Sequence, residues 1–354
     1  MIDVHTLKQK IESGEPLENL DLSGLDFDGI DLSGALFLKC TIVDVRFGTG
    51  HLSEVIFHEC RIQRATLTGT QIRQVQFNHC DLQDCRFSSS AQRDCSFSQC
   101  ELGNCEFRAC SLNSVHFFDC LFKGSSFADC EIDRGVLATS TLDDFRLSNC
   151  AVALTSLFKL DLRNSTITAC RFEKTVFQQC DLRGWHYTGQ RLVHCQFTES
   201  KLDEADLSGC TLIQSHFRDA SMRGVRLVSV QATLAQFVGA DLSDADCRHG
   251  TFDQTVWNDA RVERAAFGGS RFRYSTLQNI TAHGADFRDA DLACCDFSRA
   301  RLDGADFRDA RFARTCFHRA TLDDASWSSK DGLIEADTEL YAAESWSEPY
   351  HPVA

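Results

Sequence analysis

The sequence of 354 residues predicts an all-β fold, in which the chain winds into a four-sided coil with a short helix at each end. Two regularities predict it. From Leu22 to Trp327, 58 of the 62 positions whose numbers end in 2 or 7 hold a large apolar residue. Positions ending in 0 or 5 hold mostly small residues, among them 16 of the 19 cysteines. A repeat of five residues therefore runs unbroken along some 300 residues, which is the signature of a solenoid.

This repeat of five residues dictates a bent chain. The small and the large position lie two apart, so in an extended segment both side chains point to the same side. The next small position comes three residues later and would point outward if the strand continued. The chain must therefore bend once in every five residues, always in the same sense, which winds it around a core of alternating small and large side chains.

The aromatic residues and cysteines indicate how many fives make one turn. Positions ending in 7 hold 19 Phe, whereas positions ending in 2 hold five. Cysteines recur every twenty residues from Cys40 to Cys120, and again from Cys110 to Cys170, without a gap in either series. Turns of twenty residues stack Phe on Phe and Cys on Cys, and such like-on-like stacking satisfies the close packing of protein interiors. We therefore expect four faces per turn and about 15 coils.

The segment ADFRDADLACCDFSRARLDGADFRDA (285–310) shows the repeat most clearly. It resembles the A(D/N)LXX pattern of pentapeptide repeat proteins, and the resemblance extends from about Leu17 to Trp327. It implies a right-handed quadrilateral β-helix, and the hand rests on the resemblance alone. In the first two-thirds of the chain Cys or Val often replaces Ala, but the spacing persists, so the fold is expected to persist as well.

Three regions follow from this pattern: a capping helix in 1–16, the repeat in 17–327 and an acidic cap or tail in 328–354. Val4, Leu7 and Ile11 are spaced for one helical face, and Gly14 with Pro16 ends the segment, which predicts a helix over 3–13. The sequence DGLIEADTELYAAESW (331–346) favours a second helix over the last coil, with YHPVA (350–354) loose beyond it. Both ends of the coil leave an open edge, which allows end-to-end pairing into a homodimer.

Charge and composition exclude several classes of protein. The formal net charge is −15, of which 1–19 carry −2 and 328–354 carry −5, so the 308 residues between them carry −8. A mildly acidic body argues against direct binding to nucleic acid, which needs a basic surface. No apolar run is long enough for a transmembrane helix, and the first residues do not read as a secretory signal. Reduced cysteines in a chain of this size indicate the cytoplasm, although export by a specialised secretion system remains open.

No motif for catalysis, cofactor binding or metal binding stands out. The cysteines lie five, ten or twenty apart, not in CxxC spacing, and are expected to serve as small buried apolar residues. A smooth coil offers no pocket, so the chain is not expected to be an enzyme and no cofactor is expected. Arg288 and Arg308 lie twenty apart within FRDA strings and should form a ladder of surface ion pairs, each contributing little stability.

The segment 118–160 departs from the repeat and supplies the candidate partner-binding site. Phe118 and Phe158 follow a core position and should face water, forty residues apart on one face, and Leu154 also points outward. Exposed large apolar residues suggest a covered surface. The alternative is a local bulge that returns these side chains to the coil. Phe145 and Leu160 occupy positions meant for small residues and should widen the coil locally.

These features favour a protein-interaction scaffold or adaptor of a bacterial cytoplasm, accessory to a secretion system by analogy with similar repeat proteins. A first alternative is an acidic mimic of DNA that binds gyrase or another topoisomerase, as some pentapeptide repeat proteins do. The low charge of the body and the absence of insertions that would form protruding loops weigh against it. A second alternative is an effector secreted into another cell.

Overall fold

The computed structural model describes residues 4–347 and divides into two compact units, Met1–Asp181 and Leu182–Ala354. Both units are parallel β-solenoids and together hold about 16 turns, against about 15 predicted. Residue i pairs with residue i + 20: Phe97 lies opposite Phe77 and Phe117 in the first unit, and Asp206 opposite Arg226 in the second. The turn of twenty residues and the four-sided coil predicted from the repeat are confirmed.

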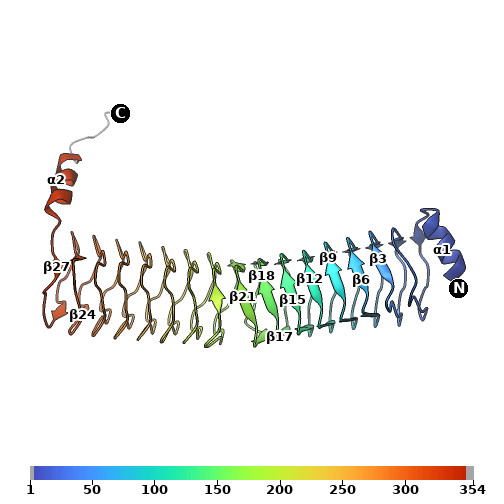
Figure 1. Ribbon diagram of the computed structural model, residues 1–354, viewed down its shortest axis with the longest axis horizontal. Coiled ribbons are helices and arrows are strands. Elements are labelled where there is room, and N and C mark those ends of the chain that lie inside the picture. The colour runs from blue at the N-terminus through green and yellow to red at the C-terminus, as the bar shows by residue number, and fades with distance from the viewer. Residues whose placement is uncertain (1–3, 348–354) are drawn as a thin grey trace. The chain divides into compact units, whose positions relative to one another are not determined.

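Three faces of the first unit are parallel sheets, whose strands lie side by side in Figure 1. The longest sheet, called sheet A here, contains in spatial order β1 (Leu17–Glu18), β2 (Leu36–Leu38), β4 (Ile56–His58), β7 (Gln76–Asn78), β10 (Ser96–Ser98), β13 (His116–Phe118), β16 (Val136–Ala138), β19 (Ser156–Phe158) and β22 (Val176–Gln178). A second sheet contains β5 (Thr66–Thr68), β8 (Arg86–Ser88), β11 (Glu106–Arg108), β14 (Ser126–Ala128), β17 (Arg146–Ser148) and β20 (Thr166–Thr168). The third contains β3 (His51–Ser53), β6 (Gln71–Arg73), β9 (Ala91–Arg93), β12 (Ser111–Asn113), β15 (Glu131–Asp133), β18 (Ala151–Ala153) and β21 (Arg171–Glu173).

The fourth face of the first unit is held by single bridges, such as Glu101 with Leu121 and Leu121 with Thr141. Corners between faces fall on positions ending in 4 or 9, where the backbone enters the left-handed region, as at Asp94 with φ of 54°. Residues with a Cβ atom pay a steric cost in that region, and Gly, Asn and Asp tolerate it best. These corners are the bends that the repeat of five requires.

In the second unit most faces are joined by single bridges rather than by longer strands. Its strands are short: β23 (Leu192–Val193), β24 (Asp306–Phe307), β25 (Thr315–Cys316), β26 (Ser326–Trp327) and β27 (Leu333–Ile334). β24 pairs with β26, and β25 pairs with β27, both in parallel.

The core of both units consists of the predicted large and small positions. Phe97 is fully buried and stacks on Phe77 and Phe117, with ring centroids 4.6 and 4.8 Å apart. In the second unit Phe217 stacks on Phe197 and Phe237 at 4.9 and 5.0 Å. Such columns, called aromatic ladders below, fill the interior because each ring is offset by one strand spacing from the next.

The N-terminal helix α1 spans Val4–Glu12, close to the predicted 3–13 (Figure 1). Leu7 is fully buried, so this side chain anchors the helix to the body of the unit. The chain leaves the helix through Gly14, whose φ of 71° is the left-handed conformation that commonly ends a helix. The predicted loose segment 350–354 lies outside the described residues.

At the other end, the prediction of a helix over 331–346 is wrong in its first part. Leu333–Ile334 form β27, because these two apolar residues continue the strand pairing of the last turn. The helix α2 spans Thr338–Ser347. Asp337 caps it, since Oδ1 accepts hydrogen bonds from the backbone N–H groups of Glu339 and Leu340 at 3.1 and 2.9 Å. Neither α1 nor α2 is long and apolar enough to cross a membrane.

A cluster of charged groups holds α2 to the last turns of the second unit. Glu344 accepts hydrogen bonds from Arg299 and from Nε2 of the buried His318, the latter at 3.2 Å. The Arg319 guanidinium lies 2.7 Å from the same carboxylate. These contacts, the His318 hydrogen bond foremost, lower the pKa of Glu344 from its ordinary value, against the opposing effect of burial.

Acid is therefore expected to release α2. A carboxyl group whose pKa is lowered by folding contributes stability above the unfolded pKa and loses it as the pH falls below about 4.5. Amide resonances of 338–347, followed by NMR between pH 7 and pH 3, should move to unfolded shifts while the solenoid core stays folded. Glu344→Gln should show the released shifts already at pH 7. An α2 that stays docked at pH 3 would refute this role of Glu344.

Candidate functional site

Two of the three predicted site residues lie on sheet A, two strands apart. Phe118 ends β13 and remains 39% exposed. It pairs with Ala138 of β16, which in turn pairs with Phe158 of β19. Ala138 is buried although its position faces outward, because a large ring stands on either side of it. Phe158 is half-buried and carries the Lys159 ammonium group 5.0 Å from its ring centroid.

Leu154 lies apart from these two rings. It occupies the corner before β19, 48% exposed, whereas Phe158 ends that strand. At about 3.3 Å per extended residue the two Cα atoms are at most about 13 Å apart, because the chain bends at Leu154. The structure therefore places Phe118 and Phe158 in one column of sheet A, on either side of Ala138, and Leu154 on the opposite margin.

Leu121 is a fourth exposed apolar side chain that sequence reasoning missed. It lies three residues beyond Phe118, around the next corner, and is 47% exposed. Its bridge partners, Glu101 and Thr141, are polar, so an apolar residue at this outward position was a readable signal. Phe118, Leu121, Ala138 and Phe158 are called the Phe118 patch below.

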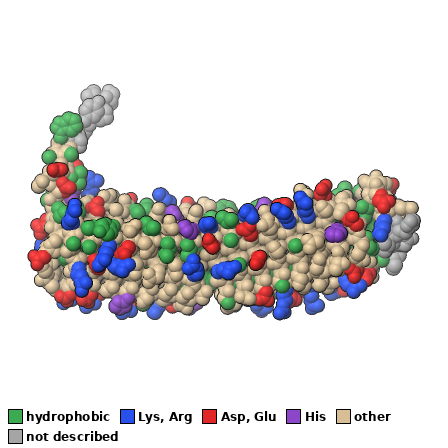
Figure 2. Space-filling model, in the orientation of Figure 1, with side chains coloured by type: hydrophobic (Ala, Val, Ile, Leu, Met, Phe, Trp, Pro, Cys, Tyr) green, Lys and Arg blue, Asp and Glu red, His purple; other side chains and the backbone are tan. Residues whose placement is uncertain are grey.

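Charged groups border the Phe118 patch. Lys159 follows Phe158, and Asp119 follows Phe118 and accepts a hydrogen bond from the Thr139 hydroxyl. Figure 2 shows acidic and basic side chains interspersed over the face in view of each unit. The patch thus has an apolar centre with charges of both signs at its margin, as docking surfaces for proteins commonly have.

Leu154 is in a backbone conformation that does not suit it. Its φ of 49° lies in the left-handed region, where a bulky L-residue costs about 1 kcal/mol or more. Leu154→Asn is therefore expected to raise the free energy of unfolding by about 0.5–1 kcal/mol, measured by urea denaturation. Asp94→Asn at an equivalent corner is the control and should change it by less than about 0.5 kcal/mol. A destabilised Leu154→Asn variant would show that the leucine contributes packing that outweighs its strain.

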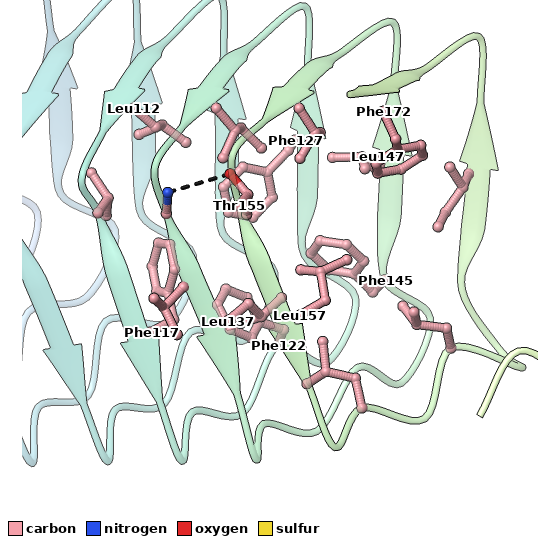
Figure 3. A pocket seen from close by; sticks show the side chains of 18 residues that line it. Leu112, Phe117, Phe122, Phe127, Leu137, Phe145, Leu147, Thr155, Leu157 and Phe172 are labelled. Atoms are coloured by element: carbon pink, nitrogen blue, oxygen red, sulfur yellow. Dashed lines mark hydrogen bonds between the residues drawn. The ribbon is translucent and has the colours of Figure 1, made fainter. Parts of the chain in front are cut away.

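Beneath this region the core of the first unit contains an apolar cavity of about 60 Å³. Figure 3 shows Phe127, Leu137, Phe145 and Leu157 among the side chains around it. Every core position of the first unit that ends in 2 or 7 is buried except four, and all four line this cavity. Those four residues are Ile132, Leu137, Leu157 and Ile167.

The cavity lies where two aromatic ladders are interrupted. In sheet A, Leu137 and Leu157 take the places between Phe117 and Phe177. In the second sheet, Leu147 and then Ile167 follow Phe127. Each substitution removes ring volume from a coil whose cross-section is otherwise set by Phe.

Two large residues stand at small positions beside the interruption. Phe145 is buried, with its ring centroid 5.8 Å from that of Phe122 and 5.6 Å from that of Phe127. Leu160 is also buried and lines the cavity. Both were predicted to widen the coil, and both lie around space that the side chains leave unfilled. At about 24 cal/mol per Å³, a void of this size costs on the order of 1.4 kcal/mol of stability.

The cysteines behave as small core residues. All nineteen are free thiols, and all but Cys294 and Cys316 are buried. Many of the buried thiols donate to a backbone carbonyl group of the preceding turn, as Cys100 Sγ does to Phe77 O at 3.3 Å. Burial raises the pKa of Cys180 and of Cys210 to about 11, which keeps these thiols protonated and unreactive at neutral pH.

The FRDA strings form the expected ladder of surface ion pairs. Arg288 donates to the Asp286 carboxylate at 2.7 Å, and Arg308 to Asp306 at 2.5 Å. Arg288 also lies 3.7 Å from Asp306, which links the two turns. The partner of each arginine is thus the aspartate two residues earlier. The hydrogen bonds from Arg288 hold the pKa of Asp286 below its ordinary value.

The expectation of a smooth surface without concavities is wrong. Besides the cavity, a groove of about 630 Å³ runs over β3, β6, β9 and β12, with His51, Arg73 and Arg93 among its lining residues. Residues 4–347 contain no group of three or more His, Cys, Asp or Glu residues placed to hold a metal ion.

Comparison with solved structures returns repeat proteins of low sequence identity. HetL, a pentapeptide repeat protein of the cyanobacterium Nostoc involved in regulating heterocyst differentiation, is 17% identical, with 86% of this chain and 97% of that chain covered and a TM-score of 0.16. Full-length QnrB1, a plasmid-mediated fluoroquinolone resistance protein, is 13% identical, with coverage of 83% and 98% and a TM-score of 0.13. A pentapeptide repeat protein of the Arabidopsis thaliana thylakoid lumen is 20% identical, with coverage of 30% and 77% and a TM-score of 0.27.

No curated protein matches the chain. Two family descriptions do match it over most of its length. "Pentapeptide repeat region" matches residues 16–87, 70–147 and 170–246, and "Pentapeptide repeats (8 copies)" matches residues 265–304 and 290–326. Together with the four-sided solenoid of twenty-residue turns, these matches show that the chain belongs to the pentapeptide repeat family.

Proposed function

We propose that this protein is a non-enzymatic interaction scaffold of a bacterial cytoplasm, and that a protein partner docks on the Phe118 patch. The observation that carries the proposal is the exposure of Phe118, where the two preceding strands end in Asn78 and Ser98, and of Leu121, whose bridge partners are polar. A large ring left half in water is a typical anchor for a partner, because covering it removes apolar area from solvent.

Leu154 supports the same reading from the opposite margin of sheet A. The left-handed conformation of the exposed Leu154 lowers the stability of the fold. The fold does not require a leucine there, because Asp94 occupies an equivalent corner of this unit with less strain. Strained residues of this kind are commonly retained where function needs them. A partner wide enough to reach from Phe118 to Leu154 would cover the outer surface of β16 and β19.

The thiols favour a reducing compartment. Nineteen free cysteines are compatible with the cytoplasm, where thiols stay reduced. A role as accessory to a secretion system is a narrower version of this proposal, whereas an exported effector is an alternative to it, and the two would differ in the partner that is recovered.

Pairing of the surface acids favours the scaffold over DNA mimicry. Asp244 accepts two hydrogen bonds from Arg264 at 2.7 Å, and Asp286 and Asp306 are paired with arginines in the same way. Duplex DNA presents one unpaired negative charge per about 1.7 Å of its axis, so neutralised aspartates imitate it poorly. Capture of gyrase or another topoisomerase is therefore the outcome that would favour the alternative.

The test compares affinity capture by three baits from a bacterial lysate, with quantitative mass spectrometry. The wild type and Phe118→Arg/Phe158→Arg are set against Leu38→Arg/Asn78→Arg, which places two arginines forty residues apart in the same column of sheet A. We expect one stoichiometric protein that the control retains and the patch variant loses. Recovery of the same protein by all three baits would contradict docking on the Phe118 patch, provided that circular dichroism and melting of the baits agree.

A further inference from the structure

The apolar cavity of the first unit lies in the core beneath the docking surface. Its volume is about 60 Å³, and its walls are Phe, Leu, Ile and Val side chains almost throughout. Protein interiors contain few voids larger than a water molecule. A void of this size in an otherwise regular coil therefore calls for a physical account.

Water does not suit this cavity. The one polar side chain in its wall is Thr155, and both capacities of that hydroxyl are used. It donates to Ala153 O at 2.8 Å and accepts from the Gly135 N–H at 3.3 Å, the contact dashed in Figure 3. A buried water needs two to four polar partners, so a cavity without free partners stays dry.

The cavity follows from two residues of the sequence that are smaller than their equivalents in other turns. The ladder of sheet A stacks five phenylalanines, from Phe37 to Phe117, with centroids 4.6–5.0 Å apart, and then changes to Leu137 and Leu157. Phe177 resumes it on the next strand. Phenylalanine at 137 and 157 would continue the column, so these leucines leave out volume that the repeat elsewhere supplies.

We propose that this cavity is a binding site for a small nonpolar molecule without hydrogen-bonding groups, such as a gas or a short hydrocarbon. A dry cavity of about 150 Å³ lined by Leu, Ile and Phe binds benzene or xenon. The present cavity has less than half that volume, which sets the upper size of the ligand near that of xenon and excludes unsubstituted aromatic rings unless the coil expands. The walls offer dispersion contacts alone, so a nonpolar and polarisable ligand fits best.

The incompletely buried core residues mark the free surface inside the cavity. Leu137 and Leu157 belong to β16 and β19, and both line the void. Ladder residues elsewhere in sheet A, such as Phe97, are fully buried. Because β16 and β19 are paired along their whole length, a ligand is expected to enter through transient opening of the coil.

The test uses crystals of the full chain under xenon pressure, with the anomalous signal of xenon as the readout. We expect one xenon site in wild type, among Phe127, Leu137 and Leu157. Leu157→Phe should abolish it, because the added ring occupies the cavity. The control is Leu67→Phe, the same substitution at the start of the other ladder, in β5, which pairs with Phe87 of β8. This variant should retain the site.

The alternatives are distinguishable. If Leu157→Phe does not fold, Leu137→Phe fills the same cavity from the neighbouring strand and takes its place. Absence of xenon from the wild-type cavity would overturn the proposal, and so would a site that persists with equal occupancy in the filled variant. The readout does not involve a protein partner, so its result is independent of docking on the Phe118 patch.

Discussion

Replacing Phe97 by alanine is expected to lower the free energy of unfolding of the first unit by about 4 kcal/mol. Phe97 is fully buried, stacks on Phe77 and Phe117, and meets the edge of Phe87 at 6.4 Å. Its removal opens a cavity in the middle of an aromatic ladder, where neighbours on rigid turns cannot collapse into the space. Urea denaturation followed by circular dichroism measures the change.

Phe118→Ala is the matched control for Phe97→Ala. It removes the same ring from the same sheet, but from an outward position that is already 39% exposed. It should lower the free energy of unfolding by less than about 1 kcal/mol, because substitutions of exposed residues outside packed regions have small effects on stability. Equal effects of the two substitutions would contradict the assignment of inward and outward faces.

A charge placed in the cysteine column should be at least as damaging. Cys100 is buried, and its thiol contacts Phe77 O and Ser98 O at 3.3 and 3.4 Å. An aspartate there would point its carboxylate at two carbonyl oxygens, with no cation in place to compensate. Cys100→Asp is expected to cost about 4 kcal/mol or more of unfolding free energy at pH 7, measured by thermal and urea denaturation.

The pH dependence separates charge from size in this variant. Burial raises the pKa of such a carboxyl group, so its neutral form is favoured in the folded state and the penalty relative to wild type should shrink as the pH falls. Cys100→Ala, which has no charge, should cost about 1 kcal/mol with no such dependence. A Cys100→Asp penalty that is constant between pH 7 and pH 4 would show that steric mismatch, not charge, is its cause.

The sequence predicts the core and the four faces because both follow from periodicity. Whether a side chain is large or small, and how far it lies from its equivalent one turn later, can be read directly from residues such as Phe77, Phe97 and Phe117. The corners can be read in the same way, since positions ending in 4 or 9 are rich in Gly, Asp and Asn. Regular spacing is a property of the sequence that needs no three-dimensional information.

The cavity, the burial of Phe158 and the strand β27 depend on three-dimensional packing and could not be predicted from the spacing of residues. The cavity is the volume left after Phe145 and Leu160 have intruded and Leu157 has replaced a ring, and no single position determines that difference. Phe158 was predicted to be exposed, yet it is half-buried against Ala138 and Lys159. The strand β27 escaped prediction because it follows the last regular repeat and pairs at a spacing of 18 residues rather than twenty.

The candidate site was predictable in part. Phe118 and Leu154 stood out because they break the pattern, and both are exposed as expected. Leu121 also departs from the pattern of polar outward residues, but this departure was overlooked next to that of Phe118. That Phe118 and Phe158 lie together while Leu154 lies across the sheet follows from the register of β13, β16 and β19. The use of this surface for docking stays a prediction.

The most direct test of that use places a photo-crosslinking residue on the surface itself. The full chain is prepared with p-benzoylphenylalanine in place of Phe118, and separately in place of His58 in the same column and of Tyr274, which is 66% exposed in the second unit. After irradiation in a bacterial lysate, a discrete protein adduct should form from position 118 and be weak or absent from the other two. An adduct of equal yield from Tyr274, or none from position 118 while one forms from His58, would contradict docking on the Phe118 patch.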